Sequence, residues 1–66
     1  MKLFKVNYME DNDYDSYLTV GNSIEEVQKR EENKLMSERS CIMFCHVYEV
    51  NEVDGYQIIV KPYNIE

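Results

Sequence analysis

The sequence predicts a single α+β domain over residues 1–66, of ββαββ order, with a four-stranded, mostly antiparallel sheet and one helix packed on one face. Three observations predict this fold: a period of two near the start, a helix-capping signature at residues 23–26, and an Asp-Gly pair near the end. Consecutive elements usually lie side by side, so the order hairpin, helix, hairpin favours one sheet.

The first hairpin is predicted from residues 2–9 and 16–20. Residues 2–9 alternate, with Phe4, Val6 and Tyr8 on one strand face and Lys5 and Asn7 on the other. Residues 10–15 have the chemistry of a turn apart from Tyr14, so we expect a loop there before the second strand.

A helix is predicted over residues 24–38. The Ser23 hydroxyl can accept a hydrogen bond from the backbone N–H of Glu26, which is how a capping box begins a helix. The segment is rich in helix-forming residues, but its apolar stripe is thin and Glu31 occupies the middle of that face.

Residues 41–50 form the most apolar segment and are predicted to be a strand. One strand face carries Ile42, Phe44, His46, Tyr48 and Val50, and the other carries Met43, Cys45 and Val47. A strand that is apolar on both sides usually lies inside a sheet or at an interface.

The Asp54-Gly55 pair predicts a tight type I′ hairpin, because that turn needs positive φ at both central residues. Val53 would then face Tyr56, Asn51 would face Ile58 and Val50 would face Ile59. The last strand is expected over residues 56–61, ended by Pro62. A single helix covers one sheet face, so the other face must be polar or must find a partner.

Size and charge oppose several functions. A core this small supplies about 3–5 kcal/mol, which leaves little to hold a strained active site. The net charge of −6 opposes direct binding to nucleic acid and to anionic membranes. The start lacks the pattern of a signal peptide, no apolar stretch is long enough to span a membrane, and two cysteines make no disulfide framework. We expect a cytoplasmic protein.

The candidates for chemistry are weak, so neither an enzyme, a metal site nor a cofactor is predicted. On a strand Cys41 and Cys45 would lie about 13 Å apart and could not share a metal ion; in a helix they would be adjacent, and metal chemistry would return. His46 could act as a general base only beside a nucleophile, and the sequence has no nucleophile motif. The acidic series that starts at Asp11 lacks the Gly and Glu of a calcium loop, with Ser16 and Asn22 in those places.

Acids and tyrosines remain as candidates for binding. The acids fall in three separate places, so mimicry of nucleic acid and simple solubility both stay open as their role. Tyrosine is favoured at interfaces. We therefore predict partner contacts at Asp13, Tyr14 and Asp15 in the first loop and at Asp54 and Tyr56 in the second turn, at opposite ends of the sheet.

Four segments, at residues 2–8, 13–17, 23–26 and 52–58, are similar to those of small uncharacterised proteins carried by phages and mobile elements of low-GC Gram-positive bacteria. The resemblance implies an inhibitor of a host defence or nucleic-acid-handling protein, comparable to an anti-CRISPR factor, that acts in the host cytosol. It gives no binding residues.

Together these observations predict a non-catalytic module that binds a larger host protein or a protein–nucleic-acid complex. The alternative is a self-associating structural or accessory protein, in which the uncovered sheet face pairs in a homodimer.

Overall fold

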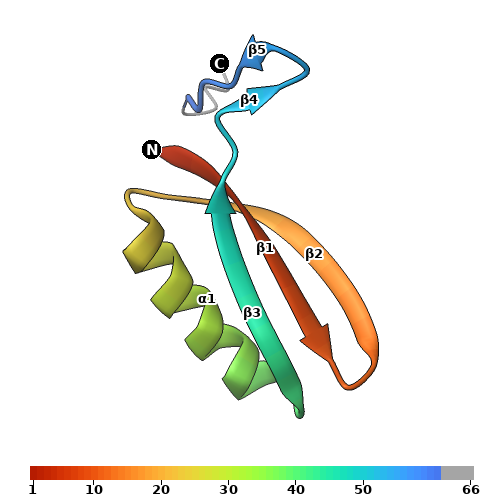
Figure 1. The fold of residues 1–66 in the computed structure, drawn as a ribbon. Coiled ribbons are helices and arrows are strands. Elements are labelled where there is room, and N and C mark those ends of the chain that lie inside the picture. Colours follow the sequence, from red (N-terminus) through yellow and green to blue (C-terminus); the bar gives the residue numbers. More distant parts are fainter. Residues whose placement is uncertain (62–66) are drawn as a thin grey trace, which may run out of the picture.

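The computed structural model describes residues 1–61 and shows a three-stranded antiparallel sheet, one helix on one of its faces and a separate short hairpin (Figure 1). In chain order the elements are β1 (Lys2–Glu10), β2 (Asp13–Gly21), α1 (Ile24–Glu38), β3 (Ile42–Glu49), β4 (Glu52–Val53) and β5 (Tyr56–Gln57). The α+β class with one helix is confirmed. The predicted four-stranded sheet is wrong, because β4 and β5 pair only with each other.

The β1–β2 hairpin is longer than predicted. Its ladder runs without interruption from Lys2 opposite Gly21 to Glu10 opposite Asp13, so only Asp11 and Asn12 form the turn. The prediction of a loop over residues 10–15 is therefore wrong. Aspartate tolerates the left-handed φ of 54° seen at Asp11, which allows so tight a reversal.

β3 pairs with the other edge of β1, which gives the strand order β2-β1-β3. The register slips near the end of β1: Met9 lies opposite Phe44, whereas Glu10 lies opposite Ile42, so Met43 is an extra residue in β3. This bulge turns Ile42 towards the helix side, where it packs against the core. The prediction that Ile42 shares a face with Phe44 is wrong for that reason.

The helix α1 has the predicted bounds. The Ser23 hydroxyl accepts a hydrogen bond from the N–H of Glu26 at 3.2 Å, and the last turn is closed by the Arg39 N–H on the carbonyl of Leu35 at 2.9 Å. The residues it buries against the sheet are Val27, Glu31 and Leu35, spaced by four as one helix face requires.

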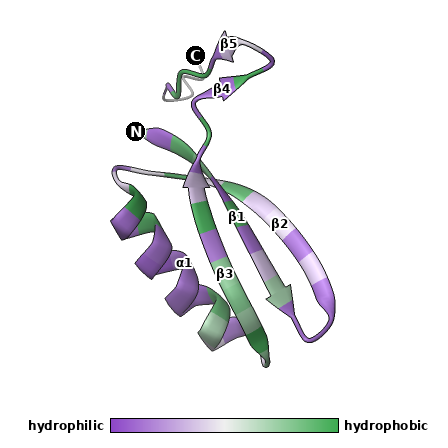
Figure 2. Cartoon of the chain, in the orientation of Figure 1, coloured by the Kyte–Doolittle hydropathy of each residue, from purple (hydrophilic) through white to green (hydrophobic). Residues whose placement is uncertain are grey.

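The core lies between α1 and the sheet. Its buried apolar residues come from β1, α1 and β3: Phe4, Val6, Tyr8, Val27, Leu35 and Val47. Most of α1 is hydrophilic, and its apolar residues lie near its two ends (Figure 2). Gly21 lets the end of β2 approach the helix, because a Cβ there would collide with Val27.

The β4–β5 hairpin has the predicted turn but not the predicted length. Asp54 and Gly55 have φ values of 54° and 83°, Val53 lies opposite Tyr56, and the Ile58 N–H donates to the Asn51 carbonyl at 2.9 Å. Val50 does not extend this pairing to Ile59, because its N–H donates to the Leu3 carbonyl of β1 at 2.8 Å. The expected strand over 56–61 thus ends at Gln57, and Pro62 lies outside the described residues.

Candidate protein-binding surface

Among residues 1–61, no helix lies over one face of the three-stranded sheet. The cross-strand register places eleven residues on this side, which we call the open face. β1 contributes alternate residues from position 3 to position 9, β2 those from 14 to 20, and β3 those from 44 to 48: Leu3, Lys5, Asn7, Met9, Tyr14, Ser16, Leu18, Val20, Phe44, His46 and Tyr48.

Large side chains on the open face are exposed. Tyr14 and Leu18 are each 60% exposed, and Val20, Phe44 and Tyr48 are each about 40% exposed. Singly exposed apolar residues are ordinary on a protein surface, but here they lie on one sheet face. This grouping makes the open face the candidate binding surface among the described residues.

Aromatic rings frame this face. Tyr14 and Phe44 stand on either side of Met9, with ring centroids 5.8 Å apart, and His46 lies 6.1 Å from Tyr48. The paired strands fix the spacing of the backbone positions that carry these rings. Tyrosine and phenylalanine are also enriched at the cores of protein interfaces.

Charge is distributed unevenly between the two sides of the sheet. The open face contains one charged residue, Lys5, and no carboxylate. The acids of β1 and β2 all point to the helix side or lie in the turn; Glu10, for example, accepts a hydrogen bond from Arg39 at 3.1 Å. Depletion of charge at the centre of a patch is a property of interface cores.

An apolar hollow of about 350 Å³ lies at the end of the sheet near the chain start. It is lined by Met1, Val20, Val60 and Lys61. Val20 belongs to the open face as well, so the hollow extends that surface towards the segment after β5.

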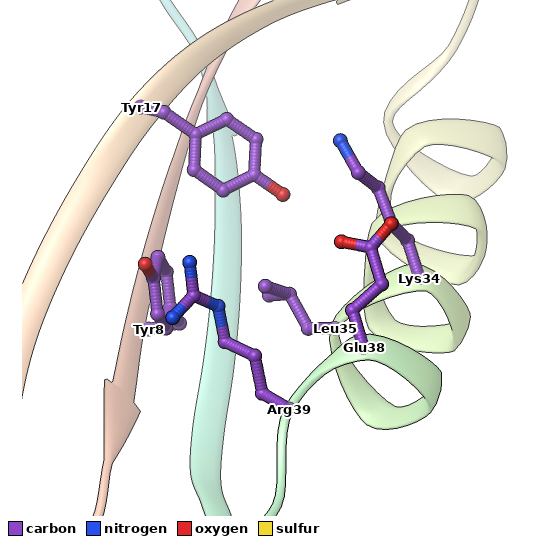
Figure 3. A pocket seen from close by; sticks show the side chains of 6 residues that line it. All are labelled: Tyr8, Tyr17, Lys34, Leu35, Glu38 and Arg39. Atoms are coloured by element: carbon purple, nitrogen blue, oxygen red, sulfur yellow. The ribbon is translucent and has the colours of Figure 1, made fainter.

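A second, smaller hollow of about 150 Å³ lies between α1 and the sheet (Figure 3). Its cations are engaged with aromatic rings: Lys34 Nζ lies 5.5 Å from the Tyr17 ring centre, and the Arg39 guanidinium lies 5.3 Å from that of Tyr8. Arg39 also pairs with Glu10, which raises the pKa of its guanidinium. These contacts hold the helix on the sheet, and Leu35 and Glu38 complete the lining of the hollow.

The residues predicted for the first loop lie in a strand. Tyr14 belongs to the open face, but Asp13 and Asp15 point to the opposite side of the sheet. The Asp15 carboxylate accepts a hydrogen bond from the N–H of Ser16 at 2.8 Å. The structure therefore separates Tyr14 from the two aspartates expected to act with it.

Asp54 and Tyr56 lie on the β4–β5 hairpin. Tyr56 is 76% exposed, and the hairpin sits at the opposite end of the molecule from the β1–β2 turn (Figure 1). The predicted separation of the two groups is therefore correct. A single small partner cannot contact both of them.

The remaining candidates for chemistry are apart from one another. β3 is a strand, as predicted, so Cys45 points to the helix side while Cys41 lies exposed before the strand; both thiols are free. Hydrogen bonding to Asp11 raises the pKa of Cys41, and burial raises that of Cys45, which makes both poorer nucleophiles. Within residues 1–61 no three acidic, histidine or cysteine side chains are grouped as metal ligands.

Sequence analysis did not single out Lys5, Leu18 or Phe44 as site residues. The signal was present, because the predicted alternation of β1 and β3 already assigns Lys5 and Phe44 to strand faces. What the sequence lacked was the pairing of β3 with β1, which brings these residues together on one surface.

Comparison with known proteins found no match for this chain. No family model matches it, and no curated protein or solved structure is significantly similar to it. In the part of the chain that the structure describes, α1 is too short and too polar to cross a bilayer.

Proposed function

We propose that this chain is a non-catalytic protein-binding module and that its contact surface is the open face. One observation carries the proposal: a sheet face with exposed aromatic and aliphatic side chains contains none of the chain's thirteen acidic residues. An ordinary solvated face would share in that charge. Depletion of charged residues on an apolar face is typical of the core of a protein interface.

The biological role that we propose is inhibition of a larger host protein or protein–nucleic-acid complex, encoded by a phage or a mobile element. Small size, acidity and the resemblance to short phage proteins support it. Since the acids of residues 1–61 lie away from the open face, we assign them to solubility rather than to mimicry of nucleic acid. The alternative is self-association through the same face.

Affinity purification from a lysate of a low-GC Gram-positive bacterium tests the proposal. Leu18→Asp places a carboxylate on the open face, and Met36→Asp makes the matched change on the helix, where Met36 is 64% exposed. We expect the parent chain and Met36→Asp to recover the same protein. Leu18→Asp should lose at least about tenfold of it, because a buried unpaired charge costs more than 1.4 kcal/mol.

Equal recovery by all three proteins would contradict the open face as the contact surface. Recovery of nothing, together with a dimer in light scattering that Leu18→Asp dissociates, would replace the proposal with the self-associating alternative.

A further inference from the structure

We infer that the partner meets the open face with an apolar surface that carries a carboxylate opposite Lys5 and inserts an apolar side chain into the hollow beside Val20. This inference rests on the proposed function and names the chemistry of the partner.

Lys5 is central to the argument. It lies on the middle strand, with Leu18 on one side and Tyr48 on the other. Its ammonium forms no ion pair with any carboxylate of residues 1–61. A partner that covers these neighbours removes water from Lys5, and an ammonium without water needs a negative partner to remain charged at acceptable cost.

A second copy of the chain does not supply that group. In a two-fold interface the open face meets itself, so every contact comes from the same eleven residues. None of those residues is acidic, and Lys5 and His46 are the only ones that can carry positive charge. Self-pairing would bury Lys5 against neutral or basic neighbours, whereas a different protein can provide a carboxylate.

The hollow beside Val20 indicates where a partner can be anchored. Its volume of about 350 Å³ is at the lower end of the range for ligand pockets and suits one large apolar side chain. Lys61 stands at its wall and adds a second positive charge to a surface without acids. Both features favour a contact surface of mixed apolar and acidic residues.

Single-stranded nucleic acid fits this surface less well. The rings of Tyr14, Phe44 and Tyr48 could stack with bases, but a phosphate backbone needs a track of cations. The open face and the hollow beside it offer Lys5 and Lys61, whereas the whole chain has thirteen acidic residues against seven basic ones. The net field repels a polyanion.

Selection from a random twelve-residue peptide library tests the inference. The immobilised baits are the parent chain, Lys5→Glu, Lys5→Gln and the matched control Lys29→Glu, which makes the same charge change on an exposed helix position. We expect the parent and Lys29→Glu to enrich peptides that combine aromatic or aliphatic residues with Asp or Glu. Lys5→Glu should enrich Lys or Arg at those acidic positions, and Lys5→Gln should show no charge preference.

Fluorescence anisotropy then measures one selected peptide and its acid-to-lysine variant. The acidic peptide should bind Lys5→Glu at least about tenfold more weakly than it binds the parent, and the lysine variant should recover binding to Lys5→Glu. Thermal unfolding of each bait verifies that it is folded.

Other outcomes overturn the inference in distinguishable ways. Leu18→Asp is included in the same anisotropy measurement. Peptides that bind Lys5→Glu unchanged but do not bind Leu18→Asp would overturn the role of Lys5 and leave the open face as the proposed site. Peptides unaffected by Leu18→Asp, or no enriched peptide at all, would remove both. Tighter binding of a labelled oligothymidine than of any peptide would assign the surface to nucleic acid.

Discussion

At the scale of single residues, Glu31 is the least expected feature of the core. The residue is only 3% exposed, between α1 and the sheet. The Tyr17 hydroxyl donates to one oxygen at 2.6 Å and Arg30 Nε donates to the other at 2.8 Å. Burial opposes ionisation of Glu31, but these hydrogen bonds and the charge of Arg30 outweigh it and lower its pKa. A charged group can therefore occupy the middle of the buried helix face.

This pair predicts a stability that falls at both ends of the pH scale. Because the pKa of Glu31 is lowered on folding, its contribution is present above about pH 4.3, the usual value in an unfolded chain, and is lost as pH falls further. Burial and the hydrogen bond to Glu31 raise the pKa of Tyr17, so its contribution is present below about pH 10 and is lost as pH rises beyond that. Urea unfolding at a series of pH values measures the loss of unfolding free energy at the acid and at the alkaline end.

Two variants separate the acid and the alkaline loss of stability. Glu31→Gln should reduce the loss of stability at acid pH. Tyr17→Phe should reduce the loss at alkaline pH, and it should lower the free energy of unfolding at neutral pH by about 1–3 kcal/mol because a buried carboxylate loses a donor. A loss at acid pH that is unchanged in Glu31→Gln would show that other carboxylates cause it.

Cys41 is under backbone strain. Its φ is 107°, in a region that favours glycine, although its carbonyl accepts a hydrogen bond from the Asp11 N–H at 2.9 Å and so fixes this conformation. Cys41→Gly should therefore raise the free energy of unfolding by about 0.5–1 kcal/mol, because the relief of strain exceeds the entropy that glycine adds to the unfolded chain. Ser40→Gly, which relieves no strain, should lower it; a loss of stability in Cys41→Gly would contradict the account.

At the scale of elements, Gln28 joins the helix to the outer edge of the sheet. Its side-chain amide donates to the Cys45 carbonyl at 2.9 Å and accepts from the Val47 N–H at 3.1 Å. Both groups face away from β1, on the edge strand β3. One amide thus satisfies a donor and an acceptor that a neighbouring strand would otherwise take, which protects the edge from pairing with another chain.

Gln28→Leu should expose this edge. We expect the free energy of unfolding to fall by about 1–3 kcal/mol, because a partly buried N–H and carbonyl lose their partners. Hydrogen exchange of the Val47 amide should become faster than that of the Val6 amide on the central strand. Gln28→Glu keeps the acceptor and loses the donor, so it should retain protection at Val47; equal exchange in all three proteins would contradict the role assigned to Gln28.

Local signals predicted the elements well and their pairing poorly. The alternation of β1, the Ser23 cap and the Asp54-Gly55 turn each depend on neighbouring residues, and all three are confirmed. The length of the second hairpin depends on a residue far away in the sequence. The Val50 N–H donates to the carbonyl of Leu3 in β1 and so does not extend the hairpin towards Ile59. The polar composition of residues 10–15 predicted a loop, but part of this segment is strand. Side chains at the end of a strand pair are exposed to solvent and need not be apolar.

The candidate site was predicted only in part for the same reason. Tyr14 was chosen as a loop residue and lies on the open face, whereas Asp13 and Asp15 point away from it. One residue of shift in a strand reverses the face to which a side chain belongs, and composition alone cannot fix that register. Nothing in the structure tests the roles proposed for Asp54 and Tyr56.

At the scale of the whole molecule, charge and apolar surface are segregated. Within residues 1–61 the acids lie in the helix, in the turns, on the helix side of the sheet and, for Glu52, in β4, while the open face carries exposed rings, aliphatic side chains and Lys5. One helix is enough to bury one side of a three-stranded sheet in so short a chain. The second side is therefore available for another protein, and its lack of acids suits it to that use.

The most direct test of this central claim is a nuclear magnetic resonance titration of the labelled chain with its purified partner. We predict that the methyl signals of Leu18 and Val20 shift or broaden, as do the ring signals of Tyr48, while those of the exposed helix residue Met36 stay unchanged. Shifts gathered on α1 or on the β4–β5 hairpin, with the Leu18 and Tyr48 signals unmoved, would contradict the assignment of the open face as the binding surface.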